Sequence, residues 1–360
     1  MAVEFIKGVR LCEVFYREAV RPILDADFPG LRHSAGRLGG GSDVLGFDDE
    51  TSRDHDWGPR VDLFVEESDW GLGDAVVRSM SEQLPAEILG YPTRFAEHGD
   101  GTLLLSADGA LDRHGVNVTS VARFFEGYAA LDVSRPPELL DWLRIPPQRL
   151  RTIASGGLFH DELGVQRIRE QLSWYPHDVW LYLMACQWRR IDQEEPFVGR
   201  TGDVGDELGS RIAAGRQVVE LMRLGFLMER QHAPYFKWFG TAFARLACSA
   251  RLEPVFRGVL DAQSWQEREG YLSEAYAIVG EMHNNLGVTS AVEAGVSRFH
   301  DRPYLVPHSG RWVEALTEAI ESAEVRALPA NIGAVWQFAD STDVLSDAST
   351  WESLSSIYRN

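Results

Sequence analysis

Cysteine is scarce in this sequence and never clustered. The chain of 360 residues has three cysteines, Cys12, Cys186 and Cys248, which lie far apart. No pair has the CxxC spacing of a zinc site or redox motif, and an odd number of thiols argues against a disulfide framework. We therefore expect mostly inert thiols in a reduced, cytoplasmic protein.

Long apolar runs are also missing. No stretch approaches the roughly eighteen residues needed to cross a membrane. The N-terminal segment has the pattern of an amphipathic helix, without the uninterrupted apolar stretch and small-residue cleavage site of a signal peptide. We expect neither a membrane span nor a signal peptide.

Several catalytic signatures are absent as well. The sequence has no P-loop, no GxGxxG after a strand, no HExxH and no GxSxG. Nothing in it therefore indicates P-loop phosphotransfer, dinucleotide binding, a zinc peptidase or an α/β-hydrolase.

Basic residues are outnumbered by acidic ones. There are 35 Lys and Arg residues against 54 Asp and Glu residues, and the formal net charge is -19. An acidic surface repels phosphate backbones, so we do not expect a sequence-independent nucleic-acid binder. Such a surface suits neutral or cationic small partners. The apolar fraction of 44% is enough for sizeable cores, and the length suggests two domains.

Local patterns divide the chain near residue 140. Apolar residues at three-and-four spacing predict a helix over residues 4–21, which Pro22 ends or kinks. The run VDLFVE at 61–66 alternates as a strand does. Further elements are expected at 72–85 and 121–131 (helices) and at 103–105 and 116–118 (strands). We predict a mixed α/β (α+β) domain over residues 1–140.

The pattern becomes helical after Pro136 and Pro137. Residues 138–300 carry helical periods and almost no strand pattern, most clearly at 206–231. One more amphipathic helix is expected at 311–326, before a Ser- and Asp-rich end. We predict a mostly α-helical domain over residues 141–360 that includes a C-terminal tail.

A glycine-rich turn and an acidic triplet precede the strand at 61–66. Gly41 and Ser42 close the turn, which offers backbone N–H groups and a hydroxyl to an anion. Asp54 and Asp56 follow, and carboxylates two residues apart on a strand face the same side. Mg²⁺ prefers such ligands together with water and substrate phosphates. The two motifs together predict a magnesium and phosphate site.

The run GGSDVLGFDDETSRDHDWGPRVDLFV resembles the signature of the nucleotidyltransferase superfamily, which has the DNA-polymerase-β-like fold. It is similar to the minimal and antibiotic-modifying members and to an uncharacterised bacterial nucleotidyltransferase-like family, to which YFKWFG at 235–240 and QFADSTDVL at 337–345 also correspond. The resemblance implies that Gly41 and Ser42 contact the triphosphate of a nucleotide. It also implies that Asp54 and Asp56 hold Mg²⁺ and are catalytic.

Two positions depart from the superfamily pattern. A third carboxylate is expected on the later strand, where the sequence has Asn117. The segment Trp57 to Arg60 separates Asp56 from the apolar strand, and Asp62 fits the usual ending of the motif better. We prefer Asp54 and Asp56 as the metal-binding pair and keep Asp62 as an alternative ligand.

Basic residues recur every seven positions in the helical half: Arg216, Arg223, Arg230 and Lys237. One interpretation is a solvated face that pairs with Glu220 and Glu229. The other, which the resemblance suggests, is that part of this row, including Arg223 and Lys237, reaches a nucleotide across a cleft between the domains. Asp192, Glu194 and Glu195 are expected to form an acidic loop.

The expected reaction follows from the resemblance. A small-molecule hydroxyl attacks the α-phosphate of a nucleoside triphosphate such as ATP with the help of Mg²⁺, in specialised metabolism or resistance. Two alternatives remain open. One is a degenerate fold that acts as a binding or regulatory, antitoxin-like protein, which Asn117 favours. The other is a repurposed enzyme acting on a nucleoside or a phosphate-bearing small molecule.

Overall fold

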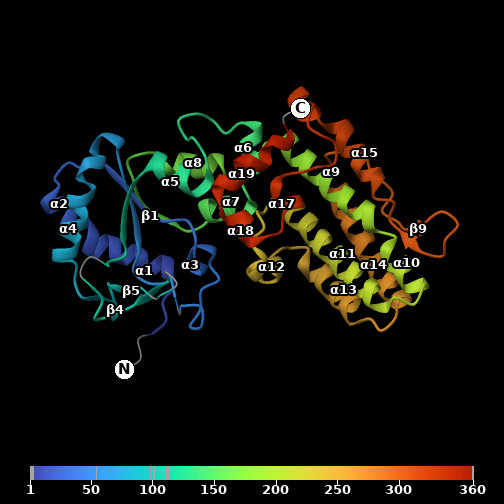
Figure 1. The fold of residues 1–360 in the computed structure, drawn as a ribbon, viewed down its shortest axis with the longest axis horizontal. Helices are drawn as coiled ribbons and strands as arrows, with labels where there is room; N and C mark the ends of the chain where they lie inside the picture. The colour runs from blue at the N-terminus through green and yellow to red at the C-terminus, as the bar shows by residue number, and fades with distance from the viewer. Residues whose placement is uncertain (1–3, 54, 98, 100–101, 111–112, 359–360) are drawn as a thin grey trace. The chain divides into compact units, whose positions relative to one another are not determined.

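The computed structural model describes residues 4–53, 55–97, 99, 102–110 and 113–358. The chain divides into two compact units (Figure 1), the first formed by Met1–Pro137 and Arg149–Ser173, and the second by Glu138–Gln148 and Trp174–Asn360. The predicted boundary at residue 140 lies close to the first change of unit. The chain then returns to the first unit for residues 149–173, which the sequence patterns did not indicate.

A four-stranded sheet with the order β7-β2-β1-β8 forms the centre of the first unit. The strands are β1 (His33–Arg37), β2 (Val61–Val65), β7 (Val116–Ser120) and β8 (Gly157–Asp161). β1 pairs antiparallel with both β2 and β8, whereas β2 and β7 are parallel. The parallel pair needs a crossover, which contains α4 (Gly73–Gln83). The strand predicted at 61–66 is confirmed.

β8 lies within residues 138–300, where the sequence shows almost no strand pattern. Its sequence, GLFHD, is short and ends in two polar residues, so it has no clear alternation. The strand forms because it pairs with β1, more than a hundred residues earlier in the chain. A local sequence pattern does not indicate pairing between segments that are distant in the chain.

The remaining elements of the first unit surround this sheet. They are α1 (Gly8–Phe15), the π-helical turn η1 (Tyr16–Val20), α2 (Arg21–Asp27), α3 (Ser42–Leu45), η2 (Glu67–Leu72), α5 (Val121–Ala129), α8 (Val165–Gln171) and the strands β3 (Glu87–Ile88), β4 (Tyr91–Pro92), β5 (Phe95–Glu97) and β6 (Leu103–Leu105). Pro22 does not end the first helix, because it occupies the first turn of α2, where a proline is tolerated.

Each face of the sheet has its own apolar core. On one face, Ala35 and Leu63 pack with Phe15 of α1, Val20 of η1 and Met80 of α4. On the other, buried residues such as Phe64 pack with residues of α5 and α8. Figure 1 shows α5 and α8 on the opposite side of the strands from α2 and α4. The alternation of side chains along β1 and β2 therefore sorts them between two environments.

The second unit is mostly helical. Its elements are α6 (Leu139–Arg144), α9 (His177–Glu194), α10 (Phe197–Asp203), α11 (Glu207–Met228), α12 (Phe236–Phe243), α13 (Ser249–Asp261), α14 (Trp265–Asn285), α15 (Gly310–Ala319), α16 (Ala323–Arg326), α17 (Val335–Phe338), α18 (Thr342–Ser346), α19 (Ala348–Leu354), η3 (Ser355–Tyr358) and the strands β9 (Ser297–Arg298) and β10 (Leu305–Val306). Helix α7 (Pro147–Ala154) begins in this unit and ends in the first.

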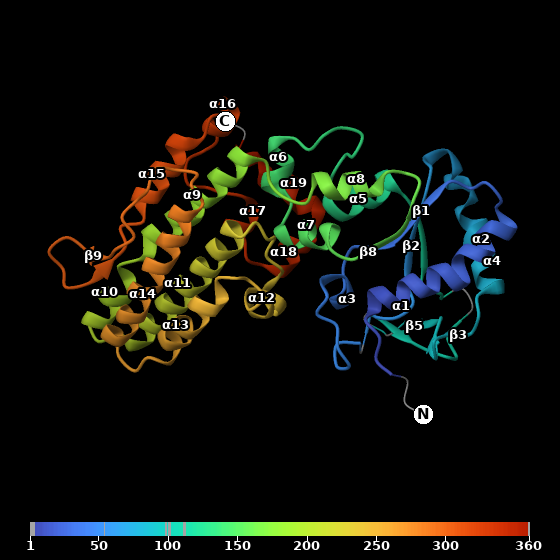
Figure 2. The same cartoon turned by 180° about the vertical axis from the view of Figure 1, so that it is seen from behind.

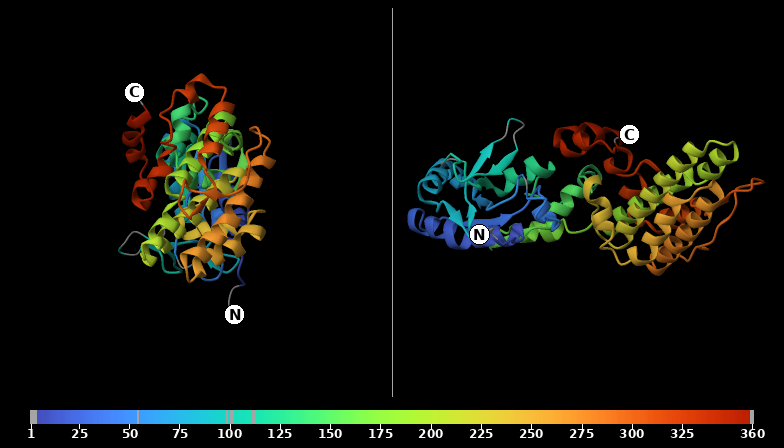
Figure 3. Two further views of the ribbon diagram at one scale, coloured as in Figure 1. Left: turned by 90° about the vertical axis from the view of Figure 1, so that its right-hand side faces the viewer. Right: turned by 90° about the horizontal axis from the view of Figure 1, so that it is seen from below.

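The long helices of the second unit lie side by side (Figure 2, Figure 3). Between α9 and α15, Trp188 stacks on Trp312 with ring centroids 4.5 Å apart, and both side chains are fully buried. The helix predicted at 206–231 is confirmed as α11, and that at 311–326 is found as α15 and α16. Within the described residues no helix is long and apolar enough to cross a membrane.

The predicted acidic loop at 192–195 is instead the end of a helix. Asp192 and Glu194 belong to α9, and Glu195 follows it directly. The Asp192 carboxylate accepts a hydrogen bond from the Gly310 backbone N–H at 3.0 Å, and Glu195 accepts one from the Ser309 N–H at 3.0 Å. These two acids therefore satisfy backbone donors where α15 begins.

Candidate functional site

The glycine-rich turn lies between β1 and α3. Gly41 has φ of 149°, and a Cβ atom there would lie 2.1 Å from Asp43 Oδ1 and 2.5 Å from Arg37 Nη2. Only glycine fits this close approach. The Ser42 hydroxyl donates to the backbone oxygen of Ser52 at 3.4 Å. The turn is thus shaped by contacts within the chain.

A buried ion pair fixes the turn. Arg37 Nε lies 2.8 Å from Asp43 Oδ2, and Arg37 Nη2 lies 3.0 Å from Asp43 Oδ1. The same guanidinium donates to the backbone oxygens of Leu38 and Gly40. Although burial opposes the charged form, Asp43 and then Asp62 raise the pKa of Arg37. Arg37 therefore stays charged and holds both sides of the turn.

Asp62 lies on the central strand β2, beside this turn. In the strand register it pairs with Gly36 of the antiparallel neighbour β1 and with Asn117 of the parallel neighbour β7. Its Oδ2 accepts a hydrogen bond from the Leu38 N–H at 3.0 Å, and its Oδ1 accepts one from Asn117 Nδ2 at 3.2 Å. The structure thus brings Asp62 and Asn117, both singled out from the sequence, into contact.

Of the preferred pair, Asp56 is placed differently from the expectation of a strand position. Asp54 lies outside the described residues. Asp56 precedes β2 and has φ of 50°, so it is not in a strand. Its backbone N–H donates to the Leu103 oxygen at 2.8 Å, and its Oδ1 accepts from the Leu103 N–H at 3.3 Å. Asp56 is therefore held against β6, and the carboxylate inside the strand is Asp62.

The interruption after Asp56 is a packed segment. Trp57 is buried in a small core with Leu11 and Tyr91, and its indole N–H donates to Asp48 Oδ2 at 3.2 Å. Asp48 is itself buried and accepts from the Gly8 N–H at 2.6 Å. Although it stands in an acidic stretch of the sequence, Asp48 is not a solvated loop charge: it joins α1 to the loop before β2.

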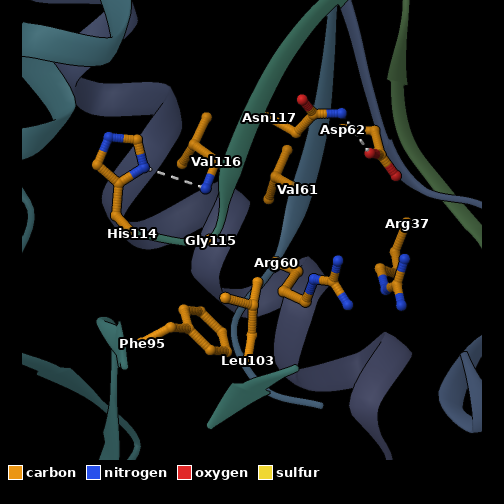
Figure 4. A pocket seen from close by; sticks show the side chains of 10 residues that line it. All are labelled: Arg37, Arg60, Val61, Asp62, Phe95, Leu103, His114, Gly115, Val116 and Asn117. Atoms are coloured by element: carbon orange, nitrogen blue, oxygen red, sulfur yellow. Dashed lines mark hydrogen bonds between the residues drawn. The ribbon is translucent and has the colours of Figure 1, made fainter. Parts of the chain in front are cut away.

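A cavity of about 300 Å³ opens where β2 and β7 begin and β1 ends (Figure 4). Its lining combines basic, acidic, amide and apolar side chains. The lining residues are Arg37, Arg60, Val61, Asp62, Phe95, Leu103, His114, Gly115, Val116 and Asn117.

Two guanidinium groups dominate the charge of this cavity. Figure 4 shows the Arg60 side chain extending toward Arg37. Burial, and next the positive charge of Arg37, lower the pKa of Arg60. Arg60 Nη1 donates to the backbone oxygen of Asp56 at 2.9 Å, and Arg60 forms no ion pair with a carboxylate of the described chain. The cavity therefore contains a partly buried cation without a paired anion.

By itself, the described lining of the cavity offers a magnesium ion a single carboxylate. Mg²⁺ binds oxygen ligands, usually with one or two carboxylates. Here the lining offers the carboxylate of Asp62 and the amide of Asn117, together with the guanidinium groups of Arg37 and Arg60. A guanidinium two residues before Asp62 repels a cation at this place. Sequence reasoning missed Arg60, although a basic residue directly before the apolar strand was the available signal.

The predicted nucleotide contacts Arg223 and Lys237 belong to the second unit. Arg223 Nη1 lies 3.3 Å from Glu220 Oε1, and the guanidinium lies over the Trp336 ring. Lys237 is exposed on α12, with its Nζ 5.3 Å from the centre of the Trp238 ring. Arg223 thus pairs with Glu220, as the alternative for this row predicted, but both side chains are largely buried and do not form a solvated face.

The other members of the basic row have separate partners. Arg216 pairs with Glu194, with Nη2 and Oε1 2.5 Å apart, and Arg230 lies over the Trp180 ring. Glu229, a predicted partner of the row, instead accepts hydrogen bonds from the backbone N–H groups of Ala247 and Cys248. The row is therefore not a single continuous cationic face.

Comparison with known proteins gives sparse results. A domain of unknown function, DUF4037, matches residues 142–239, which is less than a third of the chain. The chain is also similar to a crystal structure of a nucleotidyltransferase-like protein from Exiguobacterium sibiricum, with 10% sequence identity and a TM-score of 0.32 over 79% of this chain and 82% of that one. No curated protein matches the sequence. The match to the domain of unknown function is limited to residues 142–239.

Proposed function

We propose that the first unit binds the phosphate group of a small phosphorylated molecule, such as a nucleotide, in the cavity beside Asp62. The observation that carries the proposal is the Arg60 guanidinium, which lines the cavity and forms no ion pair among the described residues, although the charges of Asp43, Asp62 and Asp56 act on it from a greater distance. Burying a charge without a partner is unfavourable, and a bound anion removes this cost.

The neighbours of Arg60 support a phosphate as that anion. A guanidinium donates two parallel hydrogen bonds to phosphate oxygens. Repulsion between Arg37 and Arg60, which lowers the pKa of Arg60, decreases when an anion lies between them. The carboxylate of Asp62 already accepts hydrogen bonds from Leu38 and Asn117, and the side chains of Phe95 and Leu103 form an apolar wall. This combination suits a molecule that carries both a phosphate and an apolar or aromatic group.

The surface charge limits the size of this partner. The formal net charge of -19 repels a polyanion along its whole length, whereas a single phosphate in the cavity lies next to Arg60. The proposed ligand is accordingly a small molecule and not a nucleic acid.

Isothermal titration calorimetry of the full chain with ATP, AMP and inorganic phosphate, in buffer with EDTA, tests the proposal. We expect at least one of the three to bind the wild type, and Arg60→Met to weaken that binding by about 10-fold or more. Arg78→Met is the matched control, because Arg78 is exposed on α4. Absence of binding to the wild type, or equal binding by Arg60→Met, would overturn the proposal.

A second candidate is Mg²⁺-dependent transfer of a nucleoside monophosphate from a nucleoside triphosphate to a small-molecule hydroxyl. The position of Asp62 on the central strand, hydrogen-bonded to Leu38 just before the glycine-rich turn, favours it. Asp54 and Asp56 would be the further ligands, and bound Mg²⁺ would neutralise phosphate charge during the transfer.

The two candidates differ in their need for the metal. Phosphate binding through Arg60 persists in EDTA. Nucleotidyl transfer requires Mg²⁺, releases pyrophosphate when an acceptor is present, and is lost in Asp54→Asn, Asp56→Asn or Asp62→Asn. Pyrophosphate release from a mixture of candidate hydroxyl acceptors, measured with these variants, discriminates between them.

A further inference from the structure

A second cluster of polar side chains lies on the opposite face of the same sheet. His33 begins β1, His160 belongs to β8, and Glu162 follows β8 directly. One nitrogen of each imidazole and one oxygen of the carboxylate all lie within 4.8 Å of one another. His33 shares the face of β1 that carries Ala35, whereas Asp62 opposes Gly36 on the other face. The cluster is thus separate from the cavity beside Asp62.

A β-bulge in β8 places His160 in this cluster. Ala35 pairs with His160, but the next residue of β1, Gly36, pairs with Leu158, so Phe159 is the extra residue. Tyr16 stacks against both Phe159 and His160, which shows that the bulge directs two consecutive side chains to one face. Bulges often re-aim a side chain in this way near functional sites. As a result the rings of His33 and His160 lie with centroids 4.6 Å apart.

The hydrogen bonds of His33 fix its tautomer. Its Nδ1 lies 3.1 Å from the backbone oxygen of Leu31, so Nδ1 must carry the proton that it donates. Its Nε2 then has a lone pair, which accepts a hydrogen bond from the Tyr16 hydroxyl at 2.9 Å. A histidine that binds a metal through one nitrogen commonly donates from the other to a backbone carbonyl, as His33 does here.

His160 leaves a polar atom unsatisfied. Its Nε2 is buried and makes no hydrogen bond, although it lies 3.5 Å from Glu162 Oε2. A buried polar atom without a partner in a well-packed structure calls for an explanation, and an ion is one of them. Glu162 Oε2 also accepts from the His33 backbone N–H at 3.1 Å, which orients the carboxylate toward both rings.

We propose that His33, His160 and Glu162 form a binding site for a divalent transition-metal ion, best suited to Zn²⁺. Two imidazoles and one carboxylate are ligands that Zn²⁺ accepts, and three protein ligands leave one position for water or another molecule. Glu162 is partly exposed, so an ion has access from solvent. The Tyr16 hydroxyl gives up its bond to His33 Nε2 when the ion binds and then lies beside the open position.

Metal binding by the full chain tests this proposal. The protein is stripped with a chelator, dialysed, and titrated with Zn²⁺ against a chromophoric competitor. We expect one Zn²⁺ per chain, and a Co²⁺ complex whose visible absorption is characteristic of four or five ligands. His160→Gln and Glu162→Gln should each weaken Zn²⁺ binding by about 100-fold or more.

Two controls separate this site from other effects. His177→Gln removes an exposed histidine of the second unit and should bind Zn²⁺ as the wild type does. Arg60→Met should leave Zn²⁺ binding unchanged, because Arg60 lines the cavity beside Asp62. Circular dichroism confirms that each variant is folded. If the wild type takes up no Zn²⁺, or folded His160→Gln and Glu162→Gln bind it with wild-type affinity, the cluster is only a structural contact between strands.

Discussion

Arg37 and Asp43 form a buried, two-bonded ion pair across the glycine-rich turn, with the two side chains 3% and 1% exposed. Removing one partner leaves the other charge buried without compensation. We expect Arg37→Met to lower the free energy of unfolding by about 3–5 kcal/mol, as measured by urea denaturation. Replacing both residues, as in Arg37→Met with Asp43→Leu, should cost less than Arg37→Met alone. A larger loss in the double variant would contradict this account.

Alanine substitutions at the two adjacent glycines of the turn, Gly40 and Gly41, should differ in their effect on stability. In Gly41→Ala the new Cβ meets Asp43 Oδ1 and Arg37 Nη2 at distances no real Cβ atom has, and φ is positive. We expect a loss of about 1–3 kcal/mol in unfolding free energy. Gly40→Ala is the control, since nothing lies within 4 Å of its Cβ position. Equal melting temperatures for the two variants would show that the ion pair does not constrain the turn.

Asn117→Asp would place a second carboxylate beside Asp62 in the sheet. The new carboxylate would lie beside Asp62 Oδ1, to which Asn117 now donates at 3.2 Å. Two adjacent carboxylates cannot both ionise easily, so one pKa rises in the folded state. A raised pKa in the folded state makes the protein lose stability as the pH rises, so Tm should be lower at about pH 8 than at about pH 5.

Added Mn²⁺ or Mg²⁺ should recover part of that loss in Asn117→Asp and leave the wild type unchanged. Thermal denaturation at both pH values, with and without the metal, measures the effect. An equal loss of Tm at both pH values would mean that the amide matters for its shape or hydrogen bond and not for its lack of charge.

Glu195 should make the stability depend on pH in the neutral range. Burial raises the pKa of this carboxyl from 4.5 to about 7. The folded state then binds more protons than the unfolded state between these values, so the unfolding free energy falls as the pH rises from 4.5 to about 7, by up to about 3 kcal/mol. Glu195→Gln, measured by urea denaturation across this range, should flatten the profile.

Glu314→Gln is the matched control for Glu195→Gln, because Glu314 is an exposed residue of α15. It should keep the wild-type pH profile. A Glu195→Gln profile as steep as that of the wild type would assign the dependence to another group.

The cysteines should be unreactive in the folded protein. Cys12, Cys186 and Cys248 are buried, and burial raises the pKa of Cys12 and of Cys186 to about 12. The thiolate is the reactive form, so Ellman's reagent at about pH 8 should label none of the three until denaturant is added. Rapid labelling of any thiol in the native protein would contradict the burial described above.

Local sequence patterns predicted those helices and strands in which the spacing of apolar residues indicates the element. The strand at 61–66 and the helix α11 follow from apolar spacing alone. Strand β8 did not, because its pairing with β1 depends on residues far away in the chain. Strand pairing is also absent from the local pattern that favours Asp54 and Asp56 over Asp62 as the metal-binding pair. Which carboxylate lies beside the turn is decided by the pairing of β2 with β1, including the hydrogen bond from Leu38.

The sequence also does not show which charged side chains pair with one another. The sequence shows Arg37 and Asp43 six residues apart in a turn, with no sign that both are buried. It shows Arg60 in a polar loop, with no sign that Arg37 lies close enough to lower its pKa. Basic residues at a seven-residue spacing looked like one face, yet Arg216 and Arg223 pair with different acids. Such partners are set by tertiary packing.

The late position of β8 in the chain affects how the protein is made. During synthesis β1 keeps one edge unpaired until residues 157–161 have left the ribosome, after the first segment of the helical unit has already emerged. An unpaired edge strand is a template for aggregation, so β1 is exposed to this risk during that interval. A recombinant fragment that stops near residue 140 would keep that edge permanently, whereas one that extends through Ser173 would close it.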